Sequence, residues 1–226
     1  MYKVRLLNTS WHIVTLYHAT KEFAFCVLAE ANIKDPTAYD KESGFDRLLL
    51  EASGLLPPNL SPEHLPRRMA DAIASVLVKW HEQNFGARIV MYTGVLLLHD
   101  RVHVCTAGLS RVHLVKNGKL VAITRDHNPI SDPGAGSTFK NLIHPIRLHV
   151  FTRVIGVVTG DLQPECLTWE AEGNYSVLIC STYFHFFRSP EEYLDSFLRG
   201  KDLNLVAHIK QPVGVLIRID SMADMA

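Results

Sequence analysis

The residues whose types and spacing could do chemistry are concentrated between residues 100 and 138. This part of the chain contains Gly108-Leu-Ser-Arg111, Lys116-Asn-Gly-Lys119 and Thr124-Arg-Asp-His127. It also contains Pro133-Gly-Ala-Gly-Ser-Thr138, which has the small residues of a phosphate-cradling loop but not the full GxxxxGKS/T pattern. Ser110 lies outside any GxSxG context, so a nucleophile elbow is not indicated. A flexible surface loop is therefore the favoured interpretation of residues 128–141.

Metal-binding patterns are also incomplete. The chain has 12 His residues, but no HExxH, HxH or paired CxxC spacing. His103 and His113 are expected on neighbouring strands, where they could face one another across a hairpin. A structural role is favoured for them, with a His-based transition-metal site as the alternative. The four cysteines are widely scattered, and three lie in apolar runs typical of buried, reduced thiols.

One long amphipathic helix is the clearest element that could position these residues. Ser61 is a good N-cap, Pro62 suits a first helical position, and Glu63 complements the helix dipole. Apolar residues then recur every three or four positions, which predicts a face that packs on a sheet. The residues of this face are Leu65, Met69, Ala72, Ile73, Val76, Leu77 and Trp80.

Most other segments alternate as β-strands do. Two hairpins are predicted, one turning at His99-Asp100 and one at Asn117-Gly118, where positive φ is accepted easily. The predicted strands are 2–7, 12–18, 22–29, 88–98, 101–106, 111–115, 120–123, 149–158, 167–170, 175–180 and 213–219. Further helices are expected at 45–52, 189–198 and 203–210. These elements predict an α+β fold with two packed, mostly antiparallel sheets flanked by helices.

The composition restricts the possible partners. The chain has 226 residues, which fits one domain over 1–226, and its 23 basic residues balance its 23 acidic ones. Neither nucleic acid nor a membrane surface is therefore an expected partner. No apolar segment is long enough to cross a membrane and no secretory signal is evident, so we expect a cytoplasmic protein.

Four of these segments, in order, resemble the metal-dependent Ser/Thr protein phosphatases of type 2C (the PPM type). Gly108-Leu-Ser-Arg111 occupies the place of that family's Gly-Asp-Ser-Arg, and Thr124-Arg-Asp-His127 follows at the expected distance. Phe151-Thr-Arg-Val-Ile-Gly156 matches Thr-Arg-x-x-Gly, and Val177-Leu-Ile-Cys-Ser181 matches the strand before Ser-Asp-Gly. The resemblance implies an α-β-β-α sandwich and two Mn²⁺ or Mg²⁺ ions held by carboxylates.

The carboxylates that the family uses are absent from every position that can be aligned. Ala29 stands where the bridging Asp belongs, with Glu30 one residue away. Leu109, Thr182 and Gln211 replace three further acidic positions. The resemblance therefore predicts a degenerate member that keeps the fold and lacks the catalytic residues, metals and cofactors.

The expected function is thus that of a pseudophosphatase: an inactive, phosphatase-like binding or regulatory module for a protein or phosphoprotein. The old cleft, with Tyr183, and the 128–141 loop, with Asp132 and Ser137, are the candidate binding region. Homo-oligomers are also compatible with the sequence. The alternative is a divergent phosphatase with Mn²⁺ or Mg²⁺ at a rearranged site that uses Glu30, Asp126, Asp132 or Asp161.

Overall fold

The computed structural model describes residues 2–7, 13–31, 45–82, 89–128, 131, 152–156, 163–182 and 216–221. The helices are α1 (Phe45–Gly54) and α2 (Leu65–Glu82), with a short 3₁₀ helix, η3 (Pro62–His64), before α2. The strands are β1 (Tyr2–Leu7), β2 (Ile13–Ala19), β3 (Ala24–Ala31), β4 (Ile89–Leu97), β5 (Arg101–Ala107), β6 (Arg111–Lys116), β7 (Lys119–Ile123), β8 (Ile155–Gly156), β9 (Glu165–Glu170), β10 (Tyr175–Cys180) and β11 (Leu216–Ser221).

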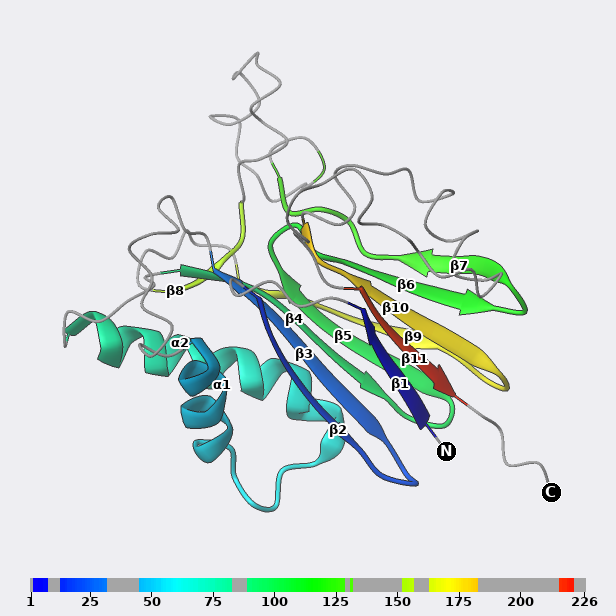
Figure 1. Ribbon diagram of the computed structural model, residues 1–226, viewed down its shortest axis with the longest axis horizontal. Coiled ribbons are helices and arrows are strands. Elements are labelled where there is room, and N and C mark those ends of the chain that lie inside the picture. The colour runs from blue at the N-terminus through cyan, green and yellow to red at the C-terminus, as the bar shows by residue number, and fades with distance from the viewer. Residues whose placement is uncertain are drawn as a thin grey trace, which may run out of the picture.

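These strands form two antiparallel sheets that pack face to face. Sheet A has the order β1-β11-β10-β6-β7, and sheet B has the order β2-β3-β4-β5-β9, with β8 paired to β4. Figure 1 shows the two sheets as adjacent layers, with α1 and α2 on the side of sheet B that faces away from sheet A. The predicted α+β sandwich is confirmed.

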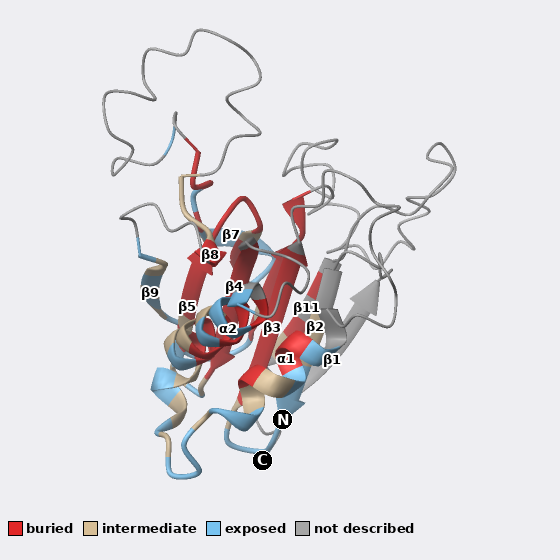
Figure 2. Cartoon of the chain, turned by 90° about the vertical axis from the view of Figure 1, so that its left-hand side faces the viewer, coloured by how far each residue is buried: buried red, intermediate tan, exposed pale blue. Residues whose placement is uncertain are grey.

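Two hydrophobic cores hold the layers together. Alternate residues of β3 supply both cores, so Ala24, Cys26 and Leu28 pack between the sheets while Phe25 and Val27 pack under the helices. Figure 2 shows this burial along the central strands of sheet B. Because both faces of β3 are covered, nearly every residue of this strand is buried, and each large apolar side chain contributes about 1.5–3 kcal/mol.

The apolar face predicted for the long helix is confirmed, and the helical segment starts after Ser61 as predicted, although its first turn is a 3₁₀ helix. Met69, Ile73 and Leu77 are fully buried against sheet B. However, Ser61 makes no side-chain capping bond, and residues 62–64 form the separate turn η3. The α-helix itself begins at Leu65, directly after η3, in which Pro62 takes the early helical position that suits proline.

Both predicted hairpins are present. β4 pairs with β5, and β6 pairs with β7 around Asn117 and Gly118, whose φ angles are 52° and 72°. The expectation that His103 and His113 face one another is wrong, because β5 belongs to sheet B and β6 to sheet A. The chain changes sheets between the two hairpins, so these histidines lie in different layers.

The helices expected at 189–198 and 203–210 lie outside the described residues. The strand expected at 149–158 is described only over 152–156, where β8 has two residues. Within the described ranges, no helix combines the length and the apolar character that a membrane span requires.

Candidate functional site

Three chain segments meet at one end of the sandwich and bring buried polar residues together. Glu30 lies near the end of β3, Ser110 lies where the chain passes from β5 to β6, and Thr182 follows β10. All three are at most 4% exposed. Because β3 belongs to sheet B and β10 to sheet A, contacts among these residues join the two sheets.

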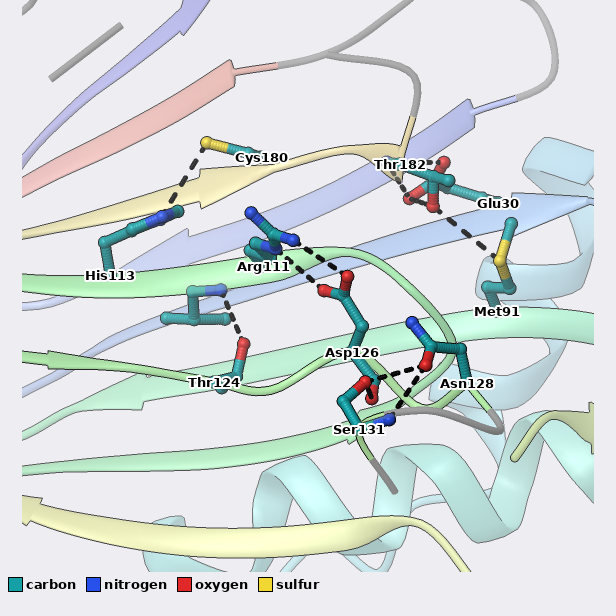
Figure 3. A network of polar contacts seen from close by, with 11 residues as sticks. Glu30, Met91, Arg111, His113, Thr124, Asp126, Asn128, Ser131, Cys180 and Thr182 are labelled. Atoms are coloured by element: carbon teal, nitrogen blue, oxygen red, sulfur yellow. Dashed lines mark hydrogen bonds and ion pairs between the residues drawn. The ribbon is translucent and has the colours of Figure 1, made fainter. Parts of the chain in front are cut away.

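The Glu30 carboxyl is the centre of this group. The Thr182 backbone N–H donates to both oxygens, at 3.0 Å to Oε1 and 3.1 Å to Oε2, and the Thr182 hydroxyl lies 3.3 Å from Oε1. The Ser110 hydroxyl also donates to Oε1. The Thr182 hydroxyl lies 3.7 Å from Met91 Sδ, so one side of the group is apolar. Figure 3 shows Glu30, Thr182 and Met91 together.

Burial sets the protonation of this carboxyl. Desolvation raises the pKa of Glu30 from its ordinary value of 4.5 to about 7, although the hydrogen bonds from Ser110 and Thr182 oppose this. No cation is paired with Glu30 in the described part of the chain, so only neutral donors compensate the negative charge. At neutral pH the carboxyl is therefore divided between its neutral and charged forms.

The structure distinguishes Glu30 from its neighbour Ala29. Ala29 packs in the core under the helices, together with Phe25 and Val27. Glu30 has the opposite orientation, because side chains alternate along a strand, and it follows Leu28 on the side facing sheet A. Of the two residues, Glu30 is the one that reaches the meeting point with Thr182.

The backbone beside Ser110 is held by a buried histidine. The Gly108 backbone N–H donates to the ring nitrogen Nδ1 of His127 at 3.2 Å. The His127 backbone N–H in turn donates to the Gly108 carbonyl at 3.0 Å. His127 Nε2 lies 3.0 Å from Glu165 Oε2. Since Nδ1 accepts a hydrogen bond, Nε2 carries the proton and donates it to Glu165. His127 therefore fixes the backbone next to Leu109, which is itself 1% exposed.

Gly108 cannot be replaced without strain. Its φ angle is 125°, and an added Cβ would lie 2.6 Å from Met91 Cγ. This value of φ and this close approach both favour glycine. The glycine at this position thus has a structural reason that does not involve catalysis.

A second acid in the same region is already paired. Asp126 is 8% exposed, and Arg111 donates to both of its carboxylate oxygens, at 2.7 and 2.8 Å. The Ser131 hydroxyl binds the Asp126 carbonyl at 2.7 Å. Figure 3 shows Arg111 and Asp126 pointing toward one another. Asp126 thus acts as the counter-ion of Arg111.

Several of the predicted site residues cannot be placed. Tyr183, Asp132, Ser137, Gln211 and Asp161 lie outside the described residues. Glu30 and Thr182 are brought into contact, Leu109 is buried in the chain next to Ser110, and Ala29 faces the helices. Within the described ranges, no group of three or more His, Cys, Asp or Glu side chains is arranged to hold a metal ion.

Sequence reasoning missed two partners in this region. Neither the Gly-Leu-Ser-Arg motif nor the test for a nucleophile predicts that Ser110 donates to a carboxyl 80 positions earlier in the chain. Glu165, which binds His127 and Arg125, was not singled out. Neither pairing has a local sequence signal, because each depends on strands from distant parts of the chain.

Comparison with known proteins identifies the architecture. No family model matches the chain, and no curated protein sequence matches it significantly. Among solved structures, the S. agalactiae Ser/Thr phosphatase matches with a TM-score of 0.72 and 13% identity, over 99% of this chain and 100% of that one. PppA, a regulatory component of T6SS in Pseudomonas aeruginosa, matches with a TM-score of 0.65 and 17% identity, over 97% and 96%.

A third solved structure, the catalytic domain of the Ser/Thr phosphatase PstP in complex with two manganese ions, matches with a TM-score of 0.62 and 16% identity, over 99% of this chain and 98% of that one. At these identities the matches establish the fold and leave the chemistry open. The sandwich, the order of its elements and these matches lead to one conclusion: this chain has the fold of the type-2C Ser/Thr protein phosphatases.

Proposed function

We propose that this chain is a catalytically inactive phosphatase-like domain that binds a protein or phosphoprotein partner in a regulatory role. The observation that carries the proposal is the environment of Glu30. This carboxyl lies where the segments that resemble the phosphatase motifs meet, and Thr182 and Ser110 bind it through neutral donors.

The donor set around Glu30 does not fit a pair of hard divalent ions. Such ions require several charged or strongly polar oxygen ligands. The neighbours of Glu30 are instead a threonine, a serine and Met91, and Leu109 is apolar. Glu30 is the one carboxylate in this group of described residues, and one carboxylate does not supply the ligands that a pair of divalent ions requires.

Among the described residues, the two other acids of this region already have cationic or histidine partners. Asp126 forms a two-bond ion pair with Arg111. Glu165 is bound by Arg125 and by His127. A metal would have to displace these partners, and each displacement would leave an arginine or a histidine without its acceptor.

A role in binding follows from what the chain retains. The two cores and both hairpins depend on apolar burial and turn geometry, which the loss of metal acids leaves intact. A stable fold without the reaction chemistry is suited to recognition of a partner, and the residues around 128–141 remain our candidate region. A chain of this fold could lack phosphatase activity with or without binding a partner, so the two properties are measured in separate experiments.

Metal binding and turnover test the inactivity. Mn²⁺ and Mg²⁺ are titrated by calorimetry and by thermal shift into the parent protein, Glu30→Gln and the exposed control Glu172→Gln, and an aryl phosphate is supplied as substrate. We expect no saturable binding, no rise in Tm and no turnover. Saturable Mn²⁺ binding that Glu30→Gln abolishes and Glu172→Gln preserves, together with turnover, would refute inactivity.

The binding role has its own assay. Fluorescently labelled phosphoserine and phosphothreonine peptide pools and their unphosphorylated counterparts are measured by anisotropy against the full chain. We expect saturable binding of at least one pool, without loss of phosphate. If neither the phosphorylated nor the unphosphorylated pool binds, the proposal that this chain recognises peptides is refuted.

The divergent-enzyme alternative is favoured by one observation, the presence of a buried acid at the junction of the motif segments. The metal titration distinguishes the two proposals, because the divergent enzyme would bind Mn²⁺ or Mg²⁺ through Glu30, Asp126, Asp132 or Asp161 and release phosphate, and the binding module would do neither.

A further inference from the structure

A pair of cysteines lies outside the site described above, on neighbouring strands of sheet B. Cys105 of β5 is directly opposite Cys166 of β9 in the antiparallel register. Cys105 is buried in the core under the helices, whereas Cys166 is exposed. The Cys105 thiol is therefore shielded from solvent, whereas reagents in solution can reach the Cys166 thiol.

The register places the two residues within the range of a disulfide. Directly opposite residues of antiparallel strands have Cα atoms about 4.5 or 5.5 Å apart, and disulfides join Cα atoms roughly 4.4–6.8 Å apart. Their Cβ atoms, about 4.5–5.5 Å apart in such pairs, would approach slightly on bonding, since about 3.8 Å is usual in disulfides. Oxidation thus requires only a small local movement.

The pair lines an open pocket of about 250 Å³ with Arg67 and His103. Arg67 is held there by Asp71, at 3.0 Å from its Nε, and by Gln163, at 2.8 Å from its Nη2. A hydrogen bond from the Cys105 thiol and the nearby Arg67 guanidinium lower the pKa of Cys166 to about 7 against the effect of burial. The hydrogen bond to Cys166, together with burial, raises the pKa of Cys105 well above its ordinary value.

We propose that Cys105 and Cys166 form a reversible thiol–disulfide switch that hydrogen peroxide oxidises. The exposed Cys166 thiolate attacks one peroxide oxygen, so an S–O bond forms, the O–O bond breaks, and hydroxide leaves and is protonated to water. Cys105 then attacks the resulting sulfenic sulfur: the S–S bond forms, the S–O bond breaks, and the hydroxyl leaves as water with the Cys105 proton. In total, two thiols lose two electrons to one peroxide, and two waters are released.

A soft metal ion is the competing occupant of this pocket. His103 Nε2 is buried and has no hydrogen-bond partner within the described residues, and it lies in the same pocket as both thiols. However, Arg67 places a positive charge beside the sulfur atoms, which stabilises a thiolate and repels a cation. Moreover, no three His, Cys, Asp or Glu side chains among the described residues are arranged here to hold a metal ion. Oxidation is therefore the better-supported chemistry.

Peptide mapping of the reduced, folded protein tests the switch. Hydrogen peroxide is added, free thiols are alkylated, and the chain is cut with trypsin and a glutamate-specific protease. The double digest separates Cys166, on peptide 166–170, from Cys180, and it releases Cys105 on peptide 102–111. We expect these two peptides to be joined by a disulfide that dithiothreitol cleaves. Cys26 and Cys180 are both buried, so they should stay reduced and react with the alkylating reagent only after the chain is unfolded.

Variants separate the two steps. In Cys105→Ala, a sulfenic acid should persist on Cys166 and be captured by dimedone; in Cys166→Ala, Cys105 should stay reduced. Cys180→Ala should form the same disulfide as the parent, and circular dichroism checks that each variant is folded. The proposal fails if peroxide reacts equally with Cys26 or Cys180, if the linked peptides appear only after unfolding, or if Zn²⁺ alone binds the reduced protein stoichiometrically and protects both thiols.

Discussion

Replacing Glu30 by glutamine should remove a pH dependence from the stability of this protein. Burial raises the pKa of Glu30 from 4.5 to about 7, so the folded state holds a proton that the unfolded chain releases. The stabilisation from this neutral carboxyl is complete below pH 4.5 and is lost as the pH rises through about 7. At about 1.4 kcal/mol per pH unit, the loss totals about 3 kcal/mol, most of it between pH 5 and pH 8.

The local geometry indicates that glutamine would be accommodated. Oε1 accepts from the Ser110 hydroxyl, the Thr182 N–H and the Thr182 hydroxyl, whereas Oε2 shares only the Thr182 N–H. An amide oxygen in the Oε1 position would therefore keep all three donors. The variant removes the titration while it preserves most of the network.

Urea unfolding of the parent and Glu30→Gln, measured at half-unit steps from pH 5 to pH 8, gives the two stability profiles. Other titrating groups, including the histidines, contribute equally to both profiles and cancel in their difference. We expect that difference to change by about 3 kcal/mol in favour of the variant as the pH rises. Glu172→Gln, an exposed position between β9 and β10, is the matched control and should follow the parent. Parallel profiles for the parent and Glu30→Gln would refute the assignment of a raised pKa to this buried carboxyl.

Three further substitutions test the surrounding contacts. Gly108→Ala should lower stability by about 2–4 kcal/mol, seen as a lower Tm, because φ is 125° and the added Cβ has no space. Arg111→Ala should cost about 3 kcal/mol in urea unfolding, since it leaves Asp126 buried without its cation. Glu165→Gln should cost about 1 kcal/mol at neutral pH, because it removes the charged acceptor of the hydrogen bond from His127. Burial alone raises the pKa of Glu165, but this hydrogen bond helps to bring the pKa below its ordinary value. That loss should vanish as the pH falls below the ordinary pKa of glutamate, where the folded parent also becomes protonated.

Each of these has a direct control. Gly54→Ala adds a Cβ that meets nothing within 4 Å, so it should leave Tm almost unchanged. The double variant Arg111→Ala/Asp126→Ala should be less destabilised than Arg111→Ala, and equal losses would argue against a coupled pair. For Glu165→Gln, an undiminished loss at low pH would show that packing, and not charge, is responsible.

The apolar pattern predicted the sandwich and α2 because helix and strand periods are visible in the sequence. Ile73 and Leu77 recur at helical spacing and are buried as expected. The start of α2 was less predictable, since Ser61-Pro62 and Leu65-Pro66 both place a proline near a helix start. Local capping signals cannot choose between two such sites when a 3₁₀ turn precedes the helix.

The candidate site was predictable only in part. Leu109 and Thr182 were identified from their motifs, and the structure brings both segments together. The orientation of Glu30 was not predictable, because β3 is buried on both faces and its pattern does not distinguish inward from outward positions. Two consecutive hairpins likewise gave no sign that the chain changes sheets between them, which is why His103 and His113 were placed together.

The order of strands in sheet A has a consequence for synthesis on the ribosome. β11 lies between β1 and β10, so Tyr2 and Tyr175 both pair with the same residue, Ser221. Among the described strands, β1 therefore has no pairing partner until β11 has been synthesised. At ribosomal rates, the residues after β10 take on the order of a few seconds to appear. During that interval the edge of β10 that later pairs with β11 is open, so we expect chaperones to bind this fold mainly between the synthesis of β10 and that of β11.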